Sequence, residues 1–291
     1  MCFSLDELGA SLTASPGIDR AHNPEFTTCE FYQAFASIDD LIDLSESLVR
    51  HLSQRVAHLR ETTLTSLPAP GFDIPAGPFP RIDFIPALEA AMDRPLPPLS
   101  DPTARTSLLN IFEALNLALP GNPSLPHLLD KLSSTFLEPQ CTSNPTFITN
   151  LPECLAPLSK SYPHPFHPHQ RVSARVELFI LGREILNAYE EENSPFEQRR
   201  KFEAQRADSQ HDRDPGGDAR IDESYLEALE WGLPPTGGWG CGVDRLVMLF
   251  TGASKISDVR SFGNLRNVVA LGTPLPAKGT GRREHTTEAG G

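Results

Sequence analysis

The sequence predicts an α+β fold, in which an antiparallel sheet is combined with helices. Residues 175–180 and 184–191 flank Gly182 and are typical of a β-hairpin. Residues 38–60 instead repeat apolar side chains at spacings of three and four, which is typical of an amphipathic helix. The chain has 291 residues, of which 39% are hydrophobic, and it can therefore bury a substantial core.

The first half of the chain is expected to contain one strand and several helices. Residues 26–36 hold aromatic residues and threonines and should form a strand, and Ser37 is placed to cap the helix that follows. Proline is frequent from 67 to 103, and because proline cannot donate to a helix or a strand ladder, this stretch should be a long connection. The other expected elements are a short embedded segment at 81–92 and helices at 106–119 and 127–136.

The second half has clearer boundaries. Residues 194–197 read Ser-Pro-Phe-Glu and combine a cap, a first-turn proline and a glutamate, which predicts a helix to about Gln205. Residues 161–170 should be a loop, as should 206–220. The remaining expected elements are a helix at 222–231 closed by Gly232, a flexible turn at 237–242 and a helix that runs to about Phe250 and is closed by Gly252.

Composition excludes several classes of protein. The formal charge of -13 argues against a surface that is basic overall, although a local basic patch can still bind RNA. The five cysteines include no C-x-x-C pair, which argues against a zinc site and favours reduced thiols inside the cell. No apolar run approaches the ~18 residues of a membrane span. The first 20 residues resemble neither a signal peptide nor a mitochondrial presequence.

Two glutamates near the hairpin turn are candidate metal ligands. Glu177 and Glu184 lie on opposite arms close to Gly182, and converging carboxylates suit a divalent cation, with Mg²⁺ favoured where phosphates share the site. In a regular strand Glu184 would face away from Asn187, so this site requires a bulge or twist near the turn. The alternative is a surface hairpin with two solvated glutamates.

A second group of residues suits a cationic ligand. Glu30 and Tyr32 are two positions apart and share one face of the predicted strand, and Asn187, Tyr189 and Glu191 share a face of the hairpin. Glu30, Tyr32 and Glu191 can enclose an ammonium group such as that of lysine. The alternative is cross-strand pairing of polar residues on an exposed sheet face.

Arg245 is a candidate phosphate ligand. It follows a glycine-rich segment at the start of a helix, where backbone N–H groups and the helix dipole favour anions and arginine adds bidentate contacts. The alternative is a packing turn in which Asp244 and Arg245 form a surface pair. His164, His167 and His169 do not have the spacing of a metal-binding pair on a helix face, and we expect them on a surface loop.

Five segments of the chain form a recognisable series. They are HNPEFTTCEFYQAF, LLDKLSSTFLEPQ, PTFI with PLSK, RVELFILGREILNAYEEENSPFEQRRKFE, and LEALEWGLPPTGGWGCGVDRLVMLF. In this order they resemble lysyl-tRNA synthetase, a class II aminoacyl-tRNA synthetase, and its fungal mitochondrial branch most of all. The resemblance implies the class II catalytic fold, an antiparallel β-sheet flanked by helices. It implies a catalytic domain at 19–272 with a proline-rich insertion at about 66–126, between a divergent segment at 1–18 and a disordered tail at 273–291.

The resemblance also implies a reaction and a set of roles. In this family ATP and lysine form lysyl-adenylate, and the lysyl group then passes to tRNA(Lys). Catalysis would rest on positioning and electrostatics, with Arg245, Glu184 and Asn187 nearest the reacting groups. The implied contacts are His22 and Arg245 at the γ-phosphate, Phe26 on adenine, Glu177 and Glu184 with Mg²⁺ and ATP, Glu30 at the α-amino group, Tyr32 and Glu191 at the ε-ammonium, and Asn187 beside the substrate carboxylate.

The resemblance breaks down before His22. Where the family has an arginine followed by Asn-Glu-Gly, this chain reads SLTASPGID, with Thr13 or Ala14 in the arginine's place. The first signature motif, which forms the dimer interface in this homodimeric family, and the anticodon-reading OB-fold are also expected to be missing. The expected protein is therefore an N-terminally truncated synthetase whose activity is weak or nil. The resemblance implies the mitochondrial matrix, or the cytoplasm in the absence of an upstream presequence.

Three alternatives remain at this point. The chain is a catalytically inactive binding module or a partner of a full-length synthetase; it is an incomplete gene prediction of an ordinary enzyme; or it is a lysine ligase that modifies an elongation factor. The segment GREILNAYEEEN resembles the tRNA synthetases more closely, which ranks the last alternative lower.

Overall fold

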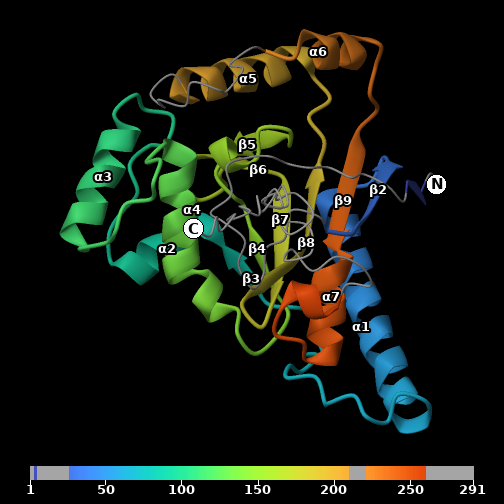
Figure 1. Ribbon diagram of the computed structural model, residues 1–291. Helices are drawn as coiled ribbons and strands as arrows, with labels where there is room; N and C mark the ends of the chain where they lie inside the picture. Colours follow the sequence, from blue (N-terminus) through green and yellow to red (C-terminus); the bar gives the residue numbers. More distant parts are fainter. Residues whose placement is uncertain (1–2, 5–25, 210–220, 260–291) are drawn as a thin grey trace, which may run out of the picture.

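A seven-stranded sheet forms the centre of the molecule (Figure 1). The computed structural model describes residues 3–4, 26–209 and 221–259. The strand order is β1-β2-β9-β8-β7-β4-β3, and every neighbouring pair is antiparallel except β3 and β4. This arrangement confirms the predicted α+β class. The strands are β1 (Phe3–Ser4), β2 (Thr28–Ala34), β3 (Arg81–Asp83), β4 (Thr146–Thr149), β7 (Arg175–Ile180), β8 (Arg183–Glu190) and β9 (Thr236–Gly242).

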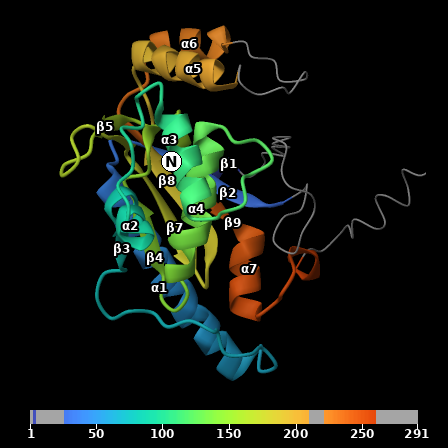
Figure 2. The ribbon, with the colours of Figure 1, turned by 90° about the vertical axis from the view of Figure 1, so that its left-hand side faces the viewer.

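Helices pack around this sheet in three groups. One helix, α1, packs against β7, β8 and β9, whereas α2, α3 and α4 form a second core beside β4. Figures 1 and 2 show α5 and α6 together at one end of the sheet. The helices are α1 (Ile38–Thr62), α2 (Phe84–Met92), α3 (Ala104–Ala114), α4 (Leu125–Phe136), α5 (Pro195–Ser209), α6 (Glu223–Glu230) and α7 (Val243–Thr251), with short turns η1 (Glu138–Gln140), η2 (Glu153–Leu155) and η3 (Ile256–Asp258) and the small hairpin β5 (Ser161–Pro163) and β6 (Arg171–Ser173). None of these helices is long and apolar enough to cross a membrane.

The first helix begins where the sequence predicts. The Ser37 hydroxyl accepts the Asp40 N–H, and the Asp40 carboxylate accepts the Ser37 N–H at 2.8 Å, which completes a capping box. Glu190 at the end of β8 adds a third contact, because its Oε1 accepts the N–H of Ile38 at 3.0 Å. The first turn of α1 is thereby tied to the strand that leads into the candidate site.

The predicted flexible turn at 237–242 is wrong, because these glycines lie in β9, between β2 and β8. A Cβ at Gly237 would come within 2.9 Å of the Leu41 Cδ1 atom and 3.2 Å of the Ala36 carbonyl. The glycines therefore allow α1 and the β2–α1 turn to approach the strand closely. Trp239 points into this same layer, where its indole N–H donates to the Ser45 hydroxyl at 2.9 Å.

Other boundaries differ from the expectation. The segment at 81–92 is divided into β3 and α2, and residues 161–163 form β5, so the loop predicted at 161–170 is wrong in part. Helix α5 continues through residues 206–209, which were expected in a loop. The predicted tail and divergent segment, with their limits at 18 and 272, fall outside the described residues.

His164 is buried, which corrects the expectation that it lies on the surface. Its Nε2 lies 3.0 Å from both carboxylate oxygens of Asp83, and its Nδ1 accepts the N–H groups of Phe166 and His167. Because Nδ1 accepts two backbone groups, the proton resides on Nε2 and is donated to Asp83. Asn150 donates to the same carboxylate at 2.8 Å. The ring thus ties the loop after β5 to β3.

We expect His164→Ala to lower the free energy of unfolding by about 2–4 kcal/mol, because it leaves two backbone N–H groups and Asp83 without their partner. His169→Ala is the matched control, since His169 is exposed on the same loop; its effect should stay within about 0.5 kcal/mol. Urea unfolding of the two variants measures the difference. Equal stability of both would contradict a structural role for His164.

Candidate functional site

Two rows of residues cross four strands on the face of the sheet that lies away from α1. Each row is set by strand register, so residues far apart in sequence become direct neighbours. The predicted parity of β2 and β8 is confirmed by this register. From β2 through β9 and β8 to β7, the rows are Glu30, Gly240, Asn187 and Glu177, and Tyr32, Gly238, Tyr189 and Arg175.

A pocket of about 280 Å³ lies over these rows. It brings together four residues that were predicted to bind one ligand: Glu30, Tyr32, Asn187 and Glu191. Gly238 and Gly240 form part of its lining, where side chains on β9 would fill the space. The opposite wall is the irregular segment 155–159, which follows η2.

Glu191 is the most unusual group in this pocket. It is only 6% exposed, and burial raises the pKa of its carboxyl to about 8. Its Oε1 has no hydrogen-bond partner among the described residues. A Cβ at Gly238 would lie 2.0 Å from this oxygen, so the carboxylate occupies space that only glycine leaves open. A buried carboxylate without a partner is unfavourable unless a cation joins it, which makes this a site for a cationic ligand.

The neighbours of Glu191 in sequence are both used within the protein. Glu190 accepts the first N–H of α1, as described above. Glu192 forms an ion pair with Lys201 at 2.6 Å and accepts the Ser194 N–H. Of these three successive glutamates, only Glu191 faces the pocket, so the strand end is fixed on both sides of the residue that is left for a ligand.

A β-bulge brings the two candidate metal ligands toward one region. Register shifts between Leu178 and Phe179, so that Phe179 pairs with Glu184, and Ile185 and Leu186 both join the α1 core. The bulge that the predicted site requires is therefore present. Burial raises the pKa of Glu177, and the nearby charge of Glu184 raises it further, against the opposing effect of Arg175.

Arginines pair with both of these carboxylates in the ligand-free chain. Arg175 Nη2 lies 2.7 Å from Glu177 Oε1, and Arg245 Nη1 lies 3.5 Å from Glu184 Oε2 and donates to the Glu184 carbonyl at 2.8 Å. The described residues include no group of three or more acidic, histidine or cysteine ligands. Two carboxylates suit a magnesium ion that arrives with phosphates, because Mg²⁺ keeps several water or phosphate ligands.

Two further carboxyl groups, which the sequence did not single out, add negative charge here. Burial raises the pKa of Glu138 to about 7, and the charges of Asp130 and Glu184 contribute. Burial also raises the pKa of Asp130 on α4. The region thus favours a cation on electrostatic grounds.

The start of α7 is joined to the beginning of β2. Asp244 is buried and accepts the Thr27 N–H at 2.7 Å, while the Thr27 carbonyl accepts the Val243 N–H at 2.9 Å. The alternative of an Asp244–Arg245 surface pair is therefore wrong. Phe26, which is 45% exposed, precedes this junction and lies at the same end of the sheet as Arg245. His22, Thr13 and Ala14 lie outside the described residues.

Sequence reasoning missed part of the pocket. Arg175, Ser159 and the rest of segment 155–159 line it, but none was assigned a role. Arg175 has the same strand parity as Glu177, which is a usable signal. Segment 155–159 offers no such signal, because its position depends on contacts with α5.

The antiparallel sheet, its bulged hairpin and the arginine at the start of α7 agree with one family. The sequence profile of the class II tRNA synthetases (D, K and N) matches residues 16–266, and the chain belongs to this family.

Its similarity to particular relatives is uniform in kind. The chain is 43% identical over 268 residues to the mitochondrial lysine–tRNA ligase of Schizosaccharomyces pombe, with 90% of this chain and 48% of the relative covered. It is 39% identical over 260 residues to lysine–tRNA ligase cla4 of Cladosporium cladosporioides (88% and 43% covered), and 36% identical over 258 residues to the lysine–tRNA ligase of Enterococcus faecalis (86% and 47%). The chain spans about half the length of the curated relatives it matches.

Proposed function

We propose that this chain binds lysine and ATP, joins them as lysyl-adenylate with release of pyrophosphate, and passes the lysyl group to tRNA(Lys). The observation that carries the proposal is the buried Glu191 carboxylate, whose Oε1 has no partner among the described residues and which lines a pocket with Glu30 and Tyr32. Membership of the family and the names of the relatives support the same assignment and favour an enzyme over an inactive binding module.

The pocket suggests how lysine is held. Glu191 and Tyr32 bind the ε-ammonium group, and Glu30, in the neighbouring row, binds the α-amino group. Asn187 lies between Glu30 and Glu177 in the cross-strand order, beside the substrate carboxylate. This order directs the reacting carboxylate of lysine toward the region of the two candidate metal ligands.

The ATP end uses residues of three elements. Glu177 and Glu184 hold Mg²⁺ with the phosphates, and Arg245, together with His22, binds the γ-phosphate. Phe26 stacks on adenine, which its exposure permits. When bound, the metal supplies positive charge against the phosphates. Arg245 exchanges Glu184 for a phosphate as Glu184 turns to the metal, so both partners of the existing pair find an opposite charge.

The chemistry then follows from positioning. A lysine carboxylate oxygen attacks the α-phosphorus, and pyrophosphate leaves from the opposite side. No protein side chain forms a covalent bond; the arginine and the oriented reactants lower the barrier. Similarity to a mitochondrial relative supports a mitochondrial site of action, and a homodimer stays a prediction of the resemblance.

The test of this function is lysine-dependent exchange between ATP and labelled pyrophosphate, made with the purified chain. We expect exchange that requires lysine and Mg²⁺ and that is not supported by norleucine, which has the same side-chain length without the ammonium group. A folded chain that binds neither lysine nor ATP would overturn the proposal.

We expect Gly238→Ala to weaken lysine binding by about tenfold or more, because its Cβ would displace the Glu191 carboxylate, which lies 2.0 Å from that position. Gly237→Ala is the matched control on the opposite face of the same strand. Its Cβ meets Leu41 and Ala36 instead, so it should lower the melting temperature more and leave lysine affinity nearly unchanged in the folded fraction. Calorimetry and thermal unfolding separate the two effects; an unchanged lysine affinity for Gly238→Ala would contradict the prediction.

A further inference from the structure

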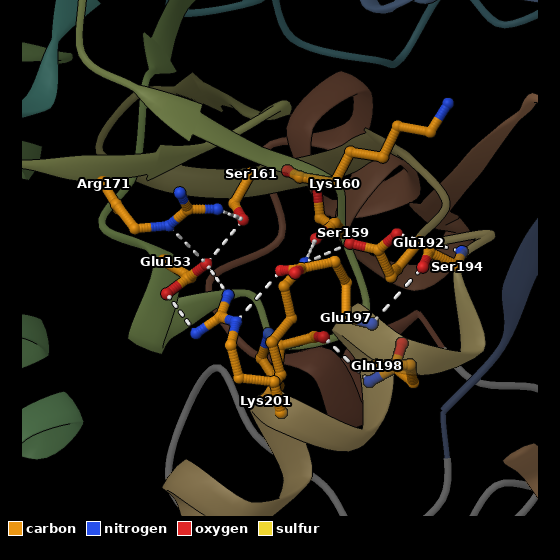
Figure 3. Close-up of polar contacts among 12 residues, drawn as sticks. Glu153, Ser159, Lys160, Ser161, Arg171, Glu192, Ser194, Glu197, Gln198 and Lys201 are labelled. Atoms are coloured by element: carbon orange, nitrogen blue, oxygen red, sulfur yellow. Dashed lines mark hydrogen bonds and ion pairs between the residues drawn. The ribbon is translucent and has the colours of Figure 1, made fainter.

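The wall of the pocket opposite the sheet has no regular secondary structure of its own. Segment 155–159 contributes five of the lining residues, and two of its carbonyls accept hydrogen bonds from buried side chains of α5. Gln198 Nε2 donates to the Pro157 carbonyl at 3.0 Å, and Lys201 Nζ donates to the Ser159 carbonyl. Figure 3 shows these residues of α5 below the wall.

Lys201 links this wall to the strand end that carries Glu191. It is 3% exposed and pairs with Glu192 at 2.6 Å while it binds the Ser159 carbonyl. The backbone continues the link, because Ser159 forms a β-bridge with Glu191 and the Glu192 N–H donates to the Leu158 carbonyl. One buried ammonium group therefore joins both sides of the pocket where the Glu191 carboxylate lies.

A second contact fixes the beginning of the wall. Arg200, next to Lys201 on α5, binds Glu153 in η2 at 2.5 Å. Although burial raises the pKa of Glu153, hydrogen bonds from Arg200, Ser161 and Arg171 hold it at about 2. Helix α5 thus holds the wall at its start, in its middle and at its end (Figure 3).

Stability alone does not account for this arrangement. A buried lysine–glutamate pair is often no more stable than apolar residues of similar size. What the pair does supply is a fixed distance between the wall and the strand end, since Lys201 binds both.

We propose that Lys201 and Gln198 are positioning residues for the lysine pocket: α5 holds segment 155–159 at the separation from Glu191 that a lysine side chain requires. The inference rests on the proposed function and assigns to α5 a role in lysine affinity, without any contact between α5 and the reacting atoms.

The test compares Lys201→Met, Lys201→Arg and the double variant Lys201→Met/Glu192→Leu in the full chain. Lysine and ATP affinities are measured by calorimetry, and hydrogen–deuterium exchange is followed in segment 155–159. Arg199→Ala is the matched control, because Arg199 lies on the same helix and binds Glu223 on the exposed side.

Lys201→Met should weaken lysine binding by about 10- to 100-fold, change ATP affinity by less than about twofold, and speed exchange in the wall. Lys201→Arg should keep most of the lysine affinity, since it retains the charge and a donor. The double variant removes the unpaired buried glutamate and should regain stability, but it lacks the bond to Ser159 and should still bind lysine weakly. The control should match the unmodified chain.

Full recovery of lysine affinity in the double variant would overturn the proposal, because the pair would then act through stability alone. Unchanged exchange in segment 155–159 after loss of Lys201 would overturn it as well, whatever the chain binds. Failure of the unmodified chain to bind lysine would instead overturn the proposed function, while the exchange measurement still decides whether α5 holds the wall.

Discussion

Glu191→Gln is expected to weaken lysine binding by about 10²–10³-fold at pH 8.5. The substitution keeps the shape of the side chain but removes the charge, and loss of one partner from a buried charged pair costs about 2–5 kcal/mol. Calorimetric titration measures the change. Glu227→Gln, on the exposed face of α6, is the control and should behave as the unmodified chain. Similar affinity in both variants would show that the ammonium group binds elsewhere.

The pH dependence of the same titration provides an independent check. The pKa of Glu191 is raised to about 8, so below this pH the carboxyl group of the empty pocket is protonated. Lysine affinity should therefore rise with pH, by up to about tenfold per unit between pH 6.5 and 8, and then level off. Binding should release a proton in this range. In Glu191→Gln both the slope and the proton release should disappear.

Stability should change in the opposite direction to binding. A carboxyl whose pKa rises from 4.5 to about 8 on folding makes folding less favourable as pH increases, because the folded chain holds a proton that the unfolded chain has lost. The penalty is absent below pH 4.5, grows through this window and is complete above pH 8, at an upper limit of about 5 kcal/mol. Glu191→Gln should therefore raise the melting temperature at pH 8.5 and leave it unchanged at pH 4.5. A lower melting temperature at pH 8.5 would contradict this account of the pocket.

Arg245→Gln is expected to lower lysine-dependent pyrophosphate exchange by about 10²–10³-fold, because it removes a preorganised cation from the phosphates. Lysine affinity should remain unchanged, since Arg245 does not line the pocket. Arg81→Gln is a suitable control, because Arg81 forms an exposed pair with Asp39 on the edge strand. Exchange at the unmodified rate in Arg245→Gln would remove Arg245 from the proposed mechanism.

Much of this site follows from local periodicity. Alternation along β2 places Glu30 and Tyr32 on one face, and alternation along β8 does the same for Asn187 and Glu191. The parity of Glu184 is wrong in a regular strand, so the sequence also indicates where a bulge must lie. These features depend on neighbours within a few residues and were therefore predictable.

Other features depend on distant contacts and were not. Glycine-rich composition in β9 resembles a turn, and its strand conformation makes sense only once Leu41 and Glu191 are packed against it. His164 is buried because of Asp83, which lies 81 residues earlier in the chain. The wall segment 155–159 has its position from α5, and nothing in its own sequence indicates that contact.

The most direct test of the central claim is a calorimetric titration of the unmodified chain with L-lysine and, separately, with L-norleucine at pH 8.5. We predict that lysine binds and that norleucine binds at least about 10²-fold more weakly, because norleucine would leave the Glu191 carboxylate buried without a cation. Equal affinity for the two amino acids, or no binding of lysine by the folded chain, would contradict the assignment of this pocket.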